Sequence, residues 1–96
     1  MSIYDKNFYR VVVNSVKQIY QEKSFKPEVI KALSERAHVE VQQQKEDPQQ
    51  WEAVSWIVKT IGESGDVSYK PFLKDLFKSS KNGKIRKYTR RAIKQL

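Results

Sequence analysis

Residues 47–62, DPQQWEAVSWIVKTIG, carry the clearest secondary-structure signals in the chain. Asp47 is a favoured residue at a helix N-cap, and Pro48 fits the first turn, where a missing N–H costs nothing. Gln50 stands where a capping box places Glu or Gln. Apolar side chains then recur with the helical period until Gly62, which suits a left-handed C-terminal cap. This stretch predicts a buried helix that ends just before Gly62.

The same helical period places apolar residues on one side of four further segments. The sequence predicts these helices at about residues 5–21, 27–41, 69–77 and 84–96. In the first of them, Phe8, Val12, Val16, Ile19 and Tyr20 share the face that should meet the core. The run of three valines at 11–13 favours a strand by propensity, but propensity is the weaker signal. We therefore expect an all-α fold with five helices.

Short motifs repeat along the chain at intervals typical of stacked helix pairs. VKQI at 16–19, VKTI at 58–61 and IKQL at 93–96 each close an odd-numbered predicted helix, and the copies lie 42 and then 35 residues apart. FKP at 25–27, followed by VIKAL, matches YKP at 69–71, followed by FLKDL. Such intervals fit helix-pair solenoids. The pattern predicts two helical hairpins and the first helix of a third.

From Trp51 to its end, the chain resembles a HEAT-like repeat array. The resemblance rests on an apolar helix ending in Ile-Gly, a short turn containing Asp66, a second helix with Pro71 in its first turn, and a following helix that is basic on its outer side. It implies five helices in antiparallel pairs, stacked as a short right-handed α-α superhelix. It also implies a protein that binds other proteins or, in some members, nucleic-acid backbone. No catalytic residue carries over from it.

Length and composition predict one small domain over residues 1–96, with about two and a half helix-pair repeats. The 96 residues are 39% hydrophobic and 31% charged and include no Cys, so packing rather than disulfides must stabilise the fold. No apolar run approaches the length of a membrane span, and the polar residues 1–10 lack the hydrophobic stretch of a secretory signal. We therefore expect a cytoplasmic protein.

The net charge of +8 is concentrated in the second half of the chain. Residues 1–50 hold eight basic and seven acidic side chains, whereas residues 51–96 hold eleven basic and four acidic ones. From Lys78 to Leu96 there are eight basic residues and no acid. Like charges gathered in this way repel one another without benefit to the fold. Their distribution predicts an anionic partner.

One side of the fifth predicted helix is apolar and the remainder is basic. Because Arg grips phosphate oxygens two at a time, this surface suits nucleic-acid backbone or an acidic protein. The helix before it adds three lysines at steps of four residues, and we predict nine residues for the combined surface: Lys70, Lys74, Lys78, Lys84, Arg86, Lys87, Arg90, Arg91 and Lys94. Trp56 and Tyr88 are predicted to take part in an interface, where aromatic rings stack on bases of a single strand.

The sequence leaves several alternatives for these features. Lys and Arg favour helices and their C-terminal turns. Solubility alone therefore explains the basic residues of the last helix as well as an anionic partner does. A protein-interaction module that docks an acidic partner or a second copy of itself is the competing function. A basic amphipathic helix also suits anionic lipid, but Thr89 and Ala92 weaken its apolar face. Trp56 is either covered by a neighbouring helix or exposed as a binding anchor.

No pattern in the sequence predicts catalysis. The single histidine, His38, falls on the polar side of its helix without a nucleophile or metal ligand beside it. Asp66 is better explained as an N-cap than as an acid or base. The sequence has no Gly-rich phosphate loop, metal-ligand cluster or catalytic triad. We therefore predict a binding module that is not an enzyme and uses no cofactor or metal.

Overall fold

The structure, a computed structural model, describes the backbone of residues 4–96 and the side chains from residue 8 onward. This part of the chain forms α1 (Tyr4–Glu22), α2 (Pro27–Gln43), α3 (Pro48–Ser64), α4 (Lys70–Ser79) and α5 (Gly83–Gln95), with a 3-10 turn at Val67–Tyr69. It contains no strand. The predicted all-α fold of five helices is confirmed. None of these helices combines the length and apolar character needed to cross a membrane.

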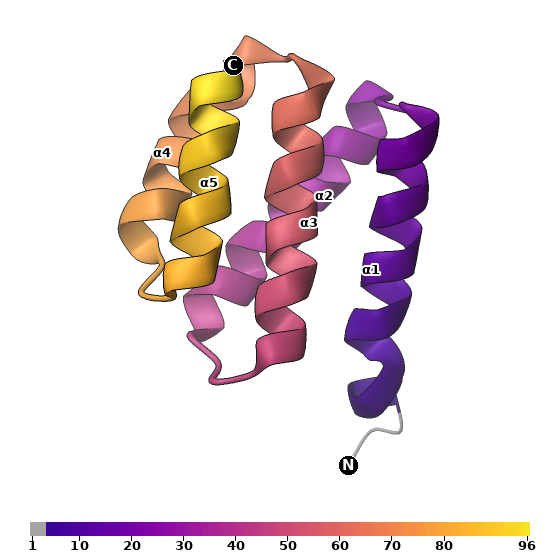
Figure 1. Cartoon of the computed structure of the whole chain (residues 1–96), viewed down its shortest axis with the longest axis vertical. Helices are drawn as coiled ribbons and strands as arrows, with labels where there is room; N and C mark the ends of the chain where they lie inside the picture. Colours follow the sequence, from indigo (N-terminus) through magenta and orange to yellow (C-terminus); the bar gives the residue numbers. More distant parts are fainter. Residues whose placement is uncertain (1–3) are drawn as a thin grey trace.

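The helices form two layers (Figure 1). α1, α3 and α5 lie side by side with α3 in the middle, while α2 and α4 lie behind them. Because α3 has neighbours on both sides and α2 at its back, it supplies more of the buried hydrophobic residues than any other helix. Val54, Ile57, Val58 and Ile61 are all completely buried. α3 is therefore the scaffold on which the other helices are placed.

The two ends of α3 differ in how well the sequence predicts them. The Asp47 carboxylate accepts a hydrogen bond from the backbone N–H of Gln49 at 3.0 Å, which confirms the predicted N-cap. The predicted C-terminal cap is wrong, because α3 continues through Gly62, and Gly65 with a φ of 75° supplies the left-handed cap. A Cβ on Gly62 would lie 2.9 Å from both Cα and Cβ of Ala92. Gly62 therefore allows α5 to approach α3 closely.

A buried polar cluster joins the first three helices. The Glu40 carboxylate, only 3% exposed, accepts hydrogen bonds from the Tyr9 hydroxyl at 2.6 Å, the Gln50 amide at 2.9 Å and the Arg36 guanidinium at 2.9 Å. The Gln50 amide also donates to the Glu40 carbonyl at 3.0 Å, so the predicted capping box is wrong. Burial opposes ionisation of Glu40, but these donors outweigh it and hold the pKa of its carboxyl below the usual value.

Candidate functional site

α5 begins at a well-formed cap and packs through a narrow apolar face. The Asn82 side chain accepts a hydrogen bond from the backbone N–H of Ile85 at 2.9 Å, which fixes the first turn. Ile85, Thr89 and Ala92 are the buried residues of the helix. The Thr89 hydroxyl donates to the Ile85 carbonyl at 2.7 Å and so is satisfied inside the core. The basic residues of α5 are consequently left to its two flanks and its outer surface.

The flank of α5 that faces α4 carries Arg86 and Arg90. Their guanidinium carbons lie 3.8 Å and 5.4 Å from the centre of the Phe77 ring. Arg86 also donates hydrogen bonds to the Phe77 carbonyl at 2.6 Å and the Ser80 carbonyl at 3.1 Å. These carbonyls belong to the last turn of α4 and the turn after it, where a positive charge is favourable. Arg86 therefore stabilises the connection between the two helices.

The three predicted lysines of α4 lie on a different helix from the other six predicted residues. Lys74 and Lys78 are exposed and Lys70 is half-buried. Within the described residues, their side chains make no hydrogen bond or ion pair. α4 belongs to the rear layer of the fold (Figure 1). The structure thus divides the nine predicted residues between two layers.

The other basic residues of α5 form a row along its outer surface. Lys84, Lys87, Arg91 and Lys94 follow one another at steps of three and four residues, and all four side chains are exposed. Such steps place residues on one side of a helix. With a rise of about 1.5 Å per residue, the row is about 15 Å long. We call these four residues the α5 row.

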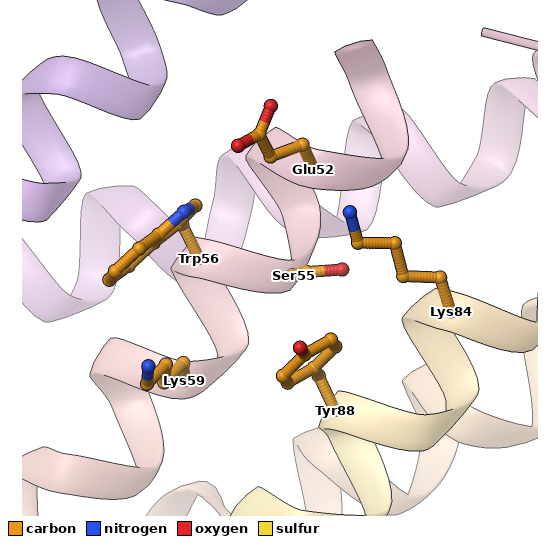
Figure 2. Close-up of a pocket in the computed structure, with 6 residues that line it drawn as sticks. All are labelled: Glu52, Ser55, Trp56, Lys59, Lys84 and Tyr88. Carbon is orange, nitrogen blue, oxygen red and sulfur yellow. The ribbon is translucent and has the colours of Figure 1, made fainter. Parts of the chain in front are cut away.

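A small cavity lies beside this row, between α3 and α5. It has a volume of about 160 Å³ and is lined by six residues, which together define the α3–α5 groove: Glu52, Ser55, Trp56, Lys59, Lys84 and Tyr88. Figure 2 shows Trp56 and Tyr88 on either side of Ser55, with Lys84 reaching from α5 toward α3. The two predicted aromatic residues therefore line one cavity, and Lys84 connects it to the α5 row.

Trp56 is neither fully covered nor fully exposed. Its half-buried ring packs against the core and meets the Tyr20 ring edge to face, with 5.7 Å between the ring centres. The ammonium nitrogens of Lys59 and Lys17 lie 4.6 Å and 5.3 Å from the ring centre. Both alternatives for this residue are thus partly realised, because α1 covers one part of the ring and another part lines the groove.

Two residues near Trp56 were missing from the predicted surface. Lys17 and Lys59 occupy the second position of VKQI and VKTI, the copies that close α1 and α3. Because α1 and α3 lie side by side, the repeat brings both lysines to the same ring (Figure 1). The sequence signal for both residues is the Lys at the second position of each copy.

Two carboxylates of the described residues, Glu40 and Glu63, form ion pairs, and neither ion pair involves a residue of α4 or α5. Within the described residues the ion pairs are Arg36 with Glu40 at 2.9 Å and Lys23 with Glu63 at 3.2 Å. Glu63 also accepts a hydrogen bond from the Gln95 amide at 2.6 Å; that bond and the one from Lys23 lower the pKa of its carboxyl. No basic residue of α4 or α5 has a carboxylate partner in this part of the chain. The α5 row therefore retains its positive charge.

The residues described by the structure offer no group of three or more His, Cys, Asp and Glu side chains arranged to hold a metal ion. Comparison with models of protein families, with curated proteins and with solved structures finds no match for this chain. The geometry and charge of the α5 row and the α3–α5 groove are therefore the features that indicate a function.

Proposed function

We propose that this protein is a HEAT-like repeat module that binds the phosphate backbone of nucleic acid, without catalysis and without sequence preference. The α5 row, continued by the α3–α5 groove, is the surface that makes the contact. The observation that carries the proposal is the absence of carboxylate partners for the basic residues of α5 in the described part of the chain. A ligand that meets this row does not have to break existing ion pairs.

The row also has the right dimensions for a charged strand. Phosphates of one duplex strand follow at about 3.4 Å along the helix axis, so a row about 15 Å long spans several of them. Each phosphate that a Lys or Arg neutralises releases a condensed counterion into solution, and this release favours binding. The outward position of Lys87 and Lys94 leaves their ammonium groups accessible for such contacts. Backbone binding of this kind requires no pocket for a specific base.

Fluorescence anisotropy of a labelled oligonucleotide tests the proposal by comparing two variants with equal changes in charge. One is Lys87→Glu with Arg91→Glu on α5. The other is Lys26→Glu with Lys31→Glu, at and near the start of α2. All four side chains are exposed and none has an ion pair with a described residue. Circular dichroism shows whether both variants keep their helices.

The expected result is a large loss of affinity for the α5 variant and a small one for the α2 variant. Equal losses in the two variants would mean that only total charge matters, and the α5 row would then not be the binding surface. If the unchanged protein failed to bind any oligonucleotide at low salt, the proposal would be wrong, and an acidic protein would become the partner to seek.

A further inference from the structure

The α3–α5 groove differs chemically from the α5 row, because it has aromatic walls. Its volume of about 160 Å³ is below the ~300–1,000 Å³ of sites for drug-sized molecules, so it suits a single planar ring system. Trp56 contributes an indole from α3 and Tyr88 a phenol from α5 (Figure 2). Phosphate contacts alone do not use these rings. The groove therefore has a property that the proposed backbone binding leaves unexplained.

The aromatic rings are held in place before any ligand arrives. Tyr20 meets the Trp56 ring at an interplanar angle of 78°, and both Trp56 and Tyr88 pack against the buried core. The Arg91 guanidinium carbon lies 5.3 Å from the centre of the Tyr88 ring. Since the surrounding contacts already restrict these side chains, little conformational entropy is lost when a flat ligand stacks on them. The groove is thus suited to stacking.

The charges around the groove are those that a nucleotide requires. Lys59 and Lys84 lie in its wall, and Arg91 lies next to Tyr88. A base held between these groups brings its own phosphates within reach of their positive charges. Glu52 also lines the groove and has no hydrogen bond or ion pair among the described side chains. Its carboxylate repels the acidic side chains of a peptide, but it accepts hydrogen bonds from the exocyclic amino groups of bases.

We infer that the α3–α5 groove holds an unpaired nucleobase, so that single-stranded nucleic acid is the preferred ligand of this protein. The inference rests on the proposed function and names its ligand class more closely. A base in a duplex is paired and stacked inside the helix, and taking it out costs unpairing and unstacking energy. A single strand presents its bases freely to aromatic side chains. The α5 row then holds the phosphates on either side of the bound base.

Four labelled ligands with equal numbers of phosphates separate this inference from the proposed function. They are a single-stranded DNA, an RNA of the same sequence, a blunt-ended DNA duplex, and an abasic DNA strand that has the phosphates but no bases. Anisotropy measures the affinity of the unchanged protein for each. We expect the DNA and RNA single strands to bind more tightly than the duplex and the abasic strand, which should still bind through their charge.

The variant Tyr88→Leu tests the aromatic wall directly. We expect it to weaken single-strand binding about tenfold, as the loss of one stacking contact does, and to leave abasic-strand binding unchanged. Tyr69→Leu is the matched control, because Tyr69 is also half-buried but lies in the 3-10 turn before α4, outside the groove. A second readout uses the variant Trp51→Phe, which leaves Trp56 as the single tryptophan. We expect a bound single strand to quench the fluorescence of Trp56.

The outcomes are distinguishable. If the abasic strand binds as tightly as the base-containing strands and Tyr88→Leu changes neither, the proposed backbone binding stands and the base site is refuted. Unchanged Trp56 fluorescence at saturating single strand would also refute the base site. If none of the four ligands binds, the proposed function fails and the base site fails with it.

Discussion

The second and last helices of the protein use charged side chains in opposite ways. On α2, Glu40 is buried and accepts hydrogen bonds from Tyr9 on α1, Arg36 on α2 and Gln50 on α3. On α5, the basic side chains of the α5 row project into solvent without a carboxylate partner among the described residues. The charge needed for folding is thus paired and covered, whereas the charge left unpaired is available to a ligand.

The largest effect on stability should come from removing the buried carboxylate of Glu40. Glu40→Ala leaves the buried donors of Tyr9 and Gln50 without their acceptor, and we expect it to lower the free energy of unfolding by about 3 kcal/mol. Urea unfolding followed by circular dichroism measures this. Glu35→Ala on the same helix is the control, because Glu35 is exposed, and its change should stay within about 0.5 kcal/mol. Equal effects of the two substitutions would contradict the claim that the buried carboxylate of Glu40 stabilises the fold.

The hydrogen bond between Tyr9 and Glu40 should make stability depend on pH at both ends of the range. Because the pKa of Glu40 is lowered in the fold, its contribution is present at neutral pH and is lost as the pH falls below about 4.5. Burial and the bond to Glu40 raise the pKa of Tyr9, so its contribution is lost as the pH rises above about 10. Thermal unfolding from pH 3 to 11 should show both losses, and Glu40→Gln should reduce them. A Glu40→Gln profile identical to that of the unchanged protein would refute this assignment.

A moderate effect is expected where α3 and α5 meet. Gly62→Ala places a Cβ against the backbone of Ala92, so α5 must shift, and we expect a loss of about 1–2 kcal/mol despite the better helix propensity of Ala. Gly83→Ala is the matched control, since no atom lies within 4 Å of the added Cβ. Chemical denaturation compares the two. An increase in stability for Gly62→Ala would show that this close approach does not restrict the helix pair.

The smallest effects on stability should come from the α5 row itself. Lys87→Ala and Arg91→Ala should each change the free energy of unfolding by less than about 0.5 kcal/mol. Arg86→Ala on the same helix should cost about 1–2 kcal/mol, because Arg86 donates hydrogen bonds to the Phe77 and Ser80 carbonyls. Thermal shift assays of the three variants test the contrast. A large loss for Lys87→Ala would give the row a structural role and weaken the case for a ligand.

The number and extent of the helices could be predicted from periodicity and capping residues. The helix predicted at 5–21 runs from Tyr4 to Glu22, and the one predicted from Pro27 does begin there. Asp47 caps α3 and Asp66 caps the 3-10 turn that precedes α4, each accepting a backbone hydrogen bond at 3.0 Å. Such signals are local, because they depend on neighbours a few residues apart in the chain.

The mistaken predictions concern contacts between helices. Gly62 suited a cap by residue type, but its role depends on Ala92, thirty positions later. α1 buries Tyr9 and Val13, which the predicted face omitted, because the Tyr9 hydroxyl reaches Glu40 on α2. Periodicity shows which side of a helix is apolar, but it does not define the edges of that side. The partner helix decides which residues at the edges are covered. For the same reason, the sequence did not predict that the guanidinium of Arg86 donates hydrogen bonds to carbonyls at the end of α4.

The most direct test of the central claim is the affinity for a labelled single-stranded oligonucleotide measured across a series of salt concentrations. If the four residues of the α5 row each neutralise a phosphate, the logarithm of the association constant should fall linearly with the logarithm of the salt concentration, with a slope of about −3. The variant with Lys87→Glu and Arg91→Glu should show a much shallower slope. An affinity that does not respond to salt, or an unchanged slope in this variant, would contradict the account.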